Sequence, residues 1–184
     1  MNGLMTYDRA VIKMDAARIT AAARKLHGTP PAFRTLVADA RTKPATWRYT
    51  TEKPAAGWEK AEFDDSSWKS GEGGFGEKTT PGSVVRTEWK TPDIWVRRTF
   101  DLPEGVAPSN VYLVLHHDED AEVYLNGVLA VKEPGYSTSY SELPLTAEGA
   151  AALRPGKNTI AIHCKQTGGG QYIDAGLAEV KAAQ

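Results

Sequence analysis

The 184-residue sequence contains a single cysteine, Cys164, and no apolar run that approaches the roughly 20 residues of a membrane-spanning helix. A disulfide within the chain is therefore excluded. Charges of the two signs nearly balance, with 22 Lys and Arg against 23 Asp and Glu, a formal net charge of −1. Because the basic residues form no patch of the kind that a phosphate backbone needs, we expect no nucleic-acid partner, and no membrane partner either.

The lone cysteine lies in a stretch of strand-like alternation. Cys164 shares one strand face with Ile160 and Ile162, a pattern that predicts a small buried apolar residue. A nucleophilic thiol would need an activating base next to it, but His163 points to the opposite face of the strand. We therefore interpret Cys164 as structural.

The chain divides into two regions that differ in periodicity. Residues 1–43 are alanine-rich, with a helix expected over 16–26 after an Asp15 cap and a linker with a short turn over 33–42. From residue 44 to residue 184 apolar and polar residues alternate with a period of two, and turn-forming residues recur at the spacing of an all-β sandwich. A short helix is expected over 146–153. The expected strands are 46–50, 94–100, 111–115, 121–125, 128–132, 159–164 and 175–180.

A β-hairpin gives the clearest local signal. Ala121, Val123 and Leu125 alternate on one strand face. Asn126-Gly127 then supplies two residues that tolerate positive φ, as a type I′ turn requires, and residues 128–131 form the return strand.

Five motifs follow one another through the second region. They are Phe63-Asp64-Asp65-Ser66-Ser67-Trp68, Gly73-Gly74-Phe75-Gly76, Ile94-Trp95-Val96-Arg97-Arg98-Thr99-Phe100, the acidic loop and hairpin over 118–127, and the run from Leu153 to His163. In this order they resemble the galactose-binding-like domains attached to glycoside hydrolases. The resemblance implies an all-β jelly-roll sandwich of about eight strands over 44–184, preceded by a helical linker within 1–43.

The first residues carry a second resemblance. Asn2-Gly3-Leu4-Met5-Thr6-Tyr7-Asp8-Arg9 is similar to the segment that closes the catalytic barrel of many family 2 glycoside hydrolases. This implies that residues 1–43 contain the end of that barrel, and that the upstream barrel of the same polypeptide is a partner and holds the catalytic carboxylates. It further implies a secreted or periplasmic protein that takes part in polysaccharide degradation.

Neither catalysis nor metal binding follows from the acidic loop. Glycoside hydrolysis usually needs two carboxylates about 5 to 10 Å apart across a sugar site, whereas adjacent acids such as Asp118, Glu119 and Asp120 are typical of turns. We expect no enzymatic activity from this domain. His116 and His117 add imidazole donors, but zinc needs a compact tetrahedron and calcium six or more oxygens. The resemblance leaves a structural calcium as the one cofactor to consider, with Asp64, Asp65 or Asp174 as ligands.

Sugar recognition depends on aromatic rings that stack on pyranose faces and on polar groups that bind the hydroxyls. Trp47, Trp68 and Trp95 are expected in the core, whereas Trp58 and Trp89 lie in loops with less to bury them. The candidate carbohydrate-binding residues are Trp89, Arg98, Asp118, Asp120, Tyr136, Tyr140, Gln171 and Tyr172.

Arg98 is anomalous because it shares a strand face with apolar Val96 and Phe100, whereas Arg97 faces the other way. A buried guanidinium is costly unless it is paired. Arg98 must therefore meet an acid or open onto a sugar-binding concavity. The site then lies either on the sheet face around Arg98 or on loop tips with Tyr136, Tyr140 and Tyr172.

These observations predict a non-catalytic carbohydrate-binding or accessory module of a secreted glycoside hydrolase, holding oligo- or polysaccharide close to the attached barrel. The alternative is a structural domain that buttresses the barrel or mediates a dimer without binding sugar. A calcium-dependent adhesion module is a third class, and it requires a cluster of oxygen ligands.

Overall fold

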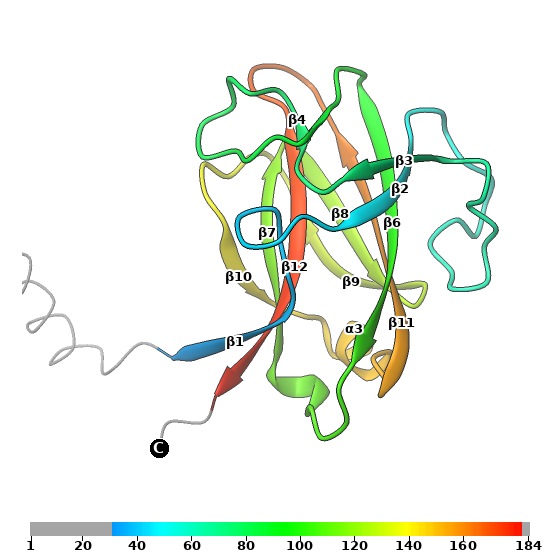
Figure 1. Ribbon diagram of the computed structural model, residues 1–184, viewed down its shortest axis with the longest axis vertical. Coiled ribbons are helices and arrows are strands. Elements are labelled where there is room, and N and C mark those ends of the chain that lie inside the picture. Colours follow the sequence, from blue (N-terminus) through cyan, green and yellow to red (C-terminus); the bar gives the residue numbers. More distant parts are fainter. Residues whose placement is uncertain (1–30, 182–184) are drawn as a thin grey trace, which may run out of the picture. The chain divides into compact units, whose positions relative to one another are not determined.

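The computed structural model describes residues 31–181, which form two six-stranded sheets packed face to face (Figure 1). The expected β-sandwich of jelly-roll type is confirmed. The expected helix over 16–26 and the barrel-like motif over 2–9 lie outside the described residues. Between residues 31 and 181 no helix is long and apolar enough to cross a bilayer.

The first sheet has the strand order β10-β7-β12-β4-β5, and β1 also pairs with β12. Its strands are β1 (Ala32–Val37), β4 (Phe75–Gly76), β5 (Thr87–Glu88), β7 (Val111–Asp118), β10 (Ser141–Pro144) and β12 (Tyr172–Lys181).

The second sheet has the order β3-β2-β6-β11-β8-β9. Its strands are β2 (Thr46–Thr50), β3 (Lys69–Glu72), β6 (Asp93–Leu102), β8 (Asp120–Leu125), β9 (Val128–Glu133) and β11 (Gly156–Lys165). Two short helices, η1 (Pro108–Asn110) and α3 (Ala147–Ala151), complete the described elements.

The core lies between the two sheets, where every second side chain of a strand points inward. In β11 the inward residues Ile160, Ile162 and Cys164 are fully buried, as their alternation predicts. Burial also raises the pKa of the Cys164 thiol, which keeps it protonated. His163 faces outward, where its ring stacks on Trp95 with the centroids 4.6 Å apart.

The predicted hairpin forms β8 and β9. Its turn residues Asn126 and Gly127 both have positive φ, 50° and 88°. Asn126 also makes contacts that no local pattern predicts, because its Nδ2 donates to the Ala152 carbonyl at 2.7 Å and its Oδ1 accepts from Thr159 N at 2.8 Å. The turn thus ties together the hairpin, the end of α3 and the start of the buried part of β11.

The expected linker over 33–42 is wrong in its first half, because Ala32–Val37 form β1. Only Val37 of this strand is buried, so the sequence lacks the apolar alternation that would reveal it. A side chain at Gly176 of β12 would lie 2.5 Å from the Val37 carbonyl, so the close approach of the two strands requires glycine there. Strands β3, β4, β5 and β10, each of two to four residues, were also missing from the expected set.

The segment between β2 and β3 crosses the outer face of the second sheet and is held there by Arg97 of β6. The Arg97 side chain is only 3% exposed, although it points away from the core. Its Nε donates to Asp65 Oδ2 at 2.8 Å, and its Nη1 donates to the carbonyls of Trp58 and Lys60. Trp58 in turn packs edge-on against Tyr124 of β8. An ion pair between the buried Arg97 and the partly exposed Asp65 therefore fixes this segment to the sheet.

Replacing Asp65 with alanine tests this attachment. Asp65→Ala leaves the buried Arg97 without its carboxylate, and we expect the free energy of unfolding to fall by about 3 kcal/mol. Urea unfolding at pH 7, followed by tryptophan fluorescence, measures the loss. The neighbouring Asp64→Ala is the matched control, since Asp64 is exposed and accepts only from Ser66 N. Equal losses in the two variants would contradict the role given to the ion pair.

Candidate functional site

Three polar side chains of the candidate region meet where the loop before β10 approaches β12. The Tyr140 hydroxyl donates to Asp174 Oδ2 at 2.7 Å and lies 2.7 Å from the Tyr172 hydroxyl. Tyr172 is fully buried and its hydroxyl also accepts from Val84 N at 3.2 Å. The structure thus brings Tyr140 and Tyr172 together in one network, in which Tyr172 is fully buried and cannot stack on a sugar and Tyr140 is half-buried.

Asp174 is the centre of this network and is 3% exposed. Its Oδ2 accepts a second hydrogen bond from Ala40 N at 2.7 Å. Burial raises the pKa of Asp174 to about 6, although the hydrogen bonds from Ala40 and Tyr140 favour the ionised form. Burial and the nearby Asp174 charge raise the pKa of both tyrosines, which therefore stay neutral.

Two further side chains enclose the tyrosines. The Arg41 guanidinium carbon lies 3.9 Å from the centre of the Tyr140 ring, a cation–π contact. The His116 ring is fully buried beside both tyrosines. Its Nε2 lies 3.2 Å from the Ser137 carbonyl, so this nitrogen carries the proton. Burial lowers the pKa of His116, which agrees with a neutral ring.

These histidines and acids do not converge on a metal. Within residues 31–181 no group of three or more His, Cys, Asp or Glu is arranged to hold a metal ion. The acids considered for calcium are separated: Asp64 accepts from Ser66 N, Asp65 pairs with Arg97, and Asp174 accepts from Tyr140.

Trp89 and Gln171 contact Thr91, in the segment that joins β5 to β6. Trp89 is 2% exposed and its Nε1 donates to Thr91 Oγ1 at 3.0 Å, so the expectation that little buries this tryptophan is wrong. Gln171 is also buried, and its Nε2 donates to the Thr91 carbonyl at 2.7 Å. Its backbone exchanges two hydrogen bonds with the Thr80 hydroxyl.

The remaining loop candidates lie near the ends of β7 and β9. Asp118 is buried, and burial raises its pKa. Asp120 is exposed and accepts from Gly135 N at 2.6 Å. Tyr136 is 68% exposed, so it is the one tyrosine of the three proposed for the loop tips that presents its ring to solvent.

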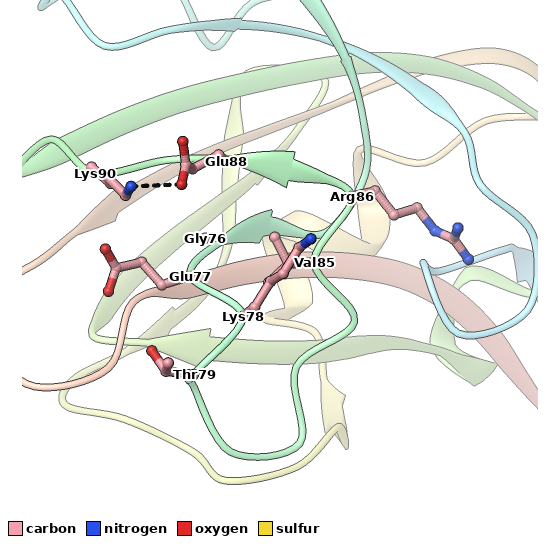
Figure 2. A pocket seen from close by; sticks show the side chains of 8 residues that line it. All are labelled: Gly76, Glu77, Lys78, Thr79, Val85, Arg86, Glu88 and Lys90. Atoms are coloured by element: carbon pink, nitrogen blue, oxygen red, sulfur yellow. Dashed lines mark ion pairs between the residues drawn. The ribbon is translucent and has the colours of Figure 1, made fainter.

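A recess of about 590 Å³ lies beside Gly76 and Glu88, the last residues of β4 and β5 (Figure 2). We call it the loop-end recess. In Figure 2 Glu77 lies on the same side as the Glu88–Lys90 ion pair, whose atoms are 2.6 Å apart. Arg86 points away from them and donates to the Ala40 carbonyl at 2.8 Å. The recess is lined by Gly76, Glu77, Lys78, Thr79, Val85, Arg86, Glu88 and Lys90.

None of the residues that line the loop-end recess was among the predicted site residues, because charged residues spread along a loop carry no sequence signal. The candidate residue Gln171 nevertheless contacts the recess lining through its backbone, because its carbonyl accepts from Glu77 N at 2.8 Å. A side chain at Gly76 would lie 2.1 Å from that same carbonyl, so only glycine fits between recess and core. The recess has no aromatic lining, and its chemistry is that of hydrogen bonds and charges.

Arg98 lies at a second recess, of about 260 Å³, which we call the arginine recess. Pairing between β2 and β6 ends at Arg48 and Arg97, next to this recess. Arg98 is half-buried and donates to the Ala38 carbonyl at 3.3 Å. Among the described residues it has no ion-pair partner. The recess is lined by Thr46, Trp47, Arg48, Asp65, Arg97, Arg98 and Thr99.

No protein-family model and no curated protein match the sequence. Among solved structures, Bacteroides uniformis β-glucuronidase 2, covalently bound to cyclophellitol-6-carboxylate aziridine, is similar over 82% of this chain and 18% of its own, with 17% identity and a TM-score of 0.51. A glycosyl hydrolase family 2 member from Bacteroides cellulosilyticus DSM 14838 is similar over 72% of this chain and 20% of its own, with 18% identity and a TM-score of 0.49. A β-glycosidase from Bacteroides vulgatus is similar over 79% and 20%, with 18% identity and a TM-score of 0.47.

The chain therefore spans about a fifth of the length of these structures. At 17% identity, the similarity to the B. uniformis protein establishes that the fold is shared. The same β-sandwich thus occurs as one part of a larger glycoside hydrolase.

The raised pKa of Asp174 predicts a pH-dependent stability. The folded protein keeps the Asp174 proton up to about pH 6, whereas the unfolded chain loses it near its ordinary pKa of 3.8. Between these values the folded state binds more protons, so this residue's contribution to stability falls as pH rises from 4 to 6. Asp174→Asn keeps an oxygen acceptor and removes the titration. Relative to the variant, the native protein should lose about 2 kcal/mol of unfolding free energy between pH 4.5 and pH 7.

Urea unfolding at several pH values measures this difference, with Asp101→Asn as a control at an exposed position. Parallel stability profiles for the native protein and Asp174→Asn would show that Asp174 titrates normally.

Proposed function

We propose that this domain is a non-catalytic accessory module of a glycoside hydrolase and that it binds glycan in the loop-end recess. The observation that carries the proposal is a recess of about 590 Å³ lined by Glu77, Lys78, Thr79, Glu88 and Lys90. Small-molecule sites commonly measure about 300 to 1,000 Å³. Carboxylates and ammonium groups together supply acceptors and donors, which is what the hydroxyls of a sugar require.

The electrostatics of the loop-end recess favour binding over hydrolysis. A general acid for glycoside cleavage needs a raised pKa. Lys90 instead lowers the pKa of Glu88, through their hydrogen bond and its charge. Glu88 is therefore an ionised acceptor, and the catalytic carboxylates belong in this proposal to a barrel upstream in the same polypeptide.

The shared fold supports the association with a glycoside hydrolase, since a β-sandwich of this kind forms part of B. uniformis β-glucuronidase 2. Fold likeness alone is a weak guide to function. The proposed module acts by holding a polysaccharide near the tethered barrel, where linkage raises the effective concentration of substrate even when intrinsic affinity is weak. A secreted or periplasmic location belongs to the same proposal.

An apolar groove of about 580 Å³ favours the structural alternative. It lies where η1, the start of β7 and α3 meet, and most of its lining is apolar. Its apolar residues include Val111, Tyr112, Leu145, Ala147 and Ala150. Exposed apolar surface of this kind marks contacts with other proteins. In this alternative the groove packs against the barrel or a second copy, and the domain binds no sugar.

Titration with neutral oligosaccharides and polysaccharides tests the proposed function. After a screen of immobilised glycans, isothermal titration gives the affinity of any glycan that binds. The double variant Lys78→Ala/Glu88→Ala removes one donor and one acceptor from the recess, and we expect an affinity loss of at least about tenfold. Glu104→Ala/Lys157→Ala removes the same two charge types from exposed positions outside the recess and should bind normally.

Two results would overturn the proposal. If the recess variant binds as well as the native protein, the glycan site lies elsewhere, and Tyr136→Ala then tests the exposed tyrosine. If the folded protein binds no glycan, the structural alternative gains support, and analytical ultracentrifugation shows whether the domain forms a dimer.

A further inference from the structure

The turn of the β8–β9 hairpin contains a chemically reactive pair of residues. In an Asn-Gly pair the glycine nitrogen can attack the asparagine Cγ. A cyclic imide forms, and the side-chain nitrogen leaves as ammonia together with the proton of the glycine N–H. Water then opens the ring to aspartate or isoaspartate. Glycine favours the attack because it has no Cβ to hinder the approach. The sequence contains two such pairs, Asn2-Gly3 and Asn126-Gly127.

The fold holds the Asn126 carboxamide at both of its polar atoms. Its Nδ2 donates to the Ala152 carbonyl at 2.7 Å and to Asn158 Oδ1 at 2.8 Å. Its Oδ1 accepts from Thr159 N at 2.8 Å, and the backbone N of Asn126 donates to the Thr159 carbonyl at 2.9 Å. The carboxamide has to rotate out of these bonds before its Cγ can meet Gly127 N. Cyclisation in the folded protein therefore requires a local opening of the turn.

Asn158, one of the partners of Asn126, is itself fixed. It is buried, and its Nδ2 donates to the carbonyls of Arg154 at 2.7 Å and Gly156 at 2.8 Å. Its Oδ1 also accepts from Arg154 N at 3.1 Å. Opening the hairpin turn removes a donor from this buried acceptor, which is unfavourable. The Asn126 side chain is thus held by a second turn that is already hydrogen-bonded throughout.

The product of deamidation does not fit the same place. A carboxylate accepts hydrogen bonds and donates none, so at position 126 it would face the Ala152 carbonyl and Asn158 Oδ1 with no proton to offer. Asn158 cannot turn its own amide to compensate, because its three bonds to the 154–156 turn would be lost. Isoaspartate would in addition lengthen the backbone of a two-residue turn, whose length sets the strand register.

We propose that Asn126 is a deamidation site that the fold protects, and that the product of the reaction destabilises the fold. The folded chain keeps the carboxamide away from Gly127 N, whereas the unfolded chain lets the two groups react. Deamidation then converts time spent unfolded into an irreversible loss of native protein. This behaviour arises in the turn alone and does not depend on glycan binding.

The rate of deamidation tests the protection. Asn2→Gln leaves Asn126-Gly127 as the single Asn-Gly pair of the chain. This variant is incubated in buffer and in urea at the same mildly alkaline pH, and mass spectrometry of its peptides follows the conversion at residue 126. We expect conversion to be at least about tenfold slower in the folded protein, because it has to wait for local opening. Equal rates in buffer and in urea would overturn the proposal.

The stability of Asn126→Asp tests the effect of the product. Asn110→Asp is the matched control, since it makes the same change of charge at an exposed position. Urea unfolding should show that Asn126→Asp raises the equilibrium constant for unfolding at least about tenfold more than the control does. Equal effects of the two substitutions would overturn the proposal.

Refolding supplies a measurement that remains valid if Asn126→Asp does not fold. Asn2→Gln is kept in urea for increasing times and then diluted into buffer, and folded chains are separated from the rest by size. We expect the folded fraction to fall as conversion at residue 126 rises, and the converted chains to accumulate among those that do not fold. The same degree of conversion in folded and unfolded fractions would overturn the proposal.

Discussion

The loop end of the sandwich depends on one buried carboxylate, that of Asp174. Its Oδ2 accepts from Ala40 N and from the Tyr140 hydroxyl, and Tyr140 passes the network on to Tyr172 and Val84. Two loops that are distant in sequence thus share the Asp174 oxygen as acceptor, and a third, at Val84, joins the network through the Tyr172 hydroxyl. An ionised carboxylate is costly to bury, and the hydrogen bonds offset only part of that cost, since its pKa stays near 6. The loop that forms one wall of the recess is therefore held in place by the core itself.

This network determines which side chains are buried and which remain at the surface to bind a ligand. Tyr172 and Trp89 are buried as structural members, so they cannot stack on a pyranose ring. The loop-end recess offers charged donors and acceptors instead, among them Lys78 and Glu77. Such groups bind hydroxyls directionally, but they must shed water to do so, which limits the net affinity. Under the proposed function, a site of this kind would select among sugars more than it would hold them tightly, which suits a module tethered to an enzyme.

The sequence predicted those parts of the fold that depend only on residues close together in the chain. The Asn126-Gly127 turn and the buried alternation of β11 follow from φ preferences and a period of two. Strands β4 and β5, of two residues each, exist only because distant segments pair there, and no local pattern encodes them. The surroundings of the candidate tyrosines could not be predicted for the same reason. The position of the half-buried Tyr140 depends on Asp174 and Arg41, which are far away in sequence. The loop-end recess is likewise a product of tertiary packing.

The neighbouring arginines Arg97 and Arg98 of β6 show that the burial and pairing of a charged side chain depend on contacts that are distant in sequence. Arg97 faces outward, where a sequence reader expects solvent, but the Asp65 segment covers and satisfies it. Arg98 faces inward and is half-buried, and there it donates to the Ala38 carbonyl and lies over the Trp47 ring. The Trp47 ring and the charge of Asp174 offset part of the cost of burying a guanidinium that has one carbonyl partner, so this residue too is stabilised by contacts that are distant in sequence.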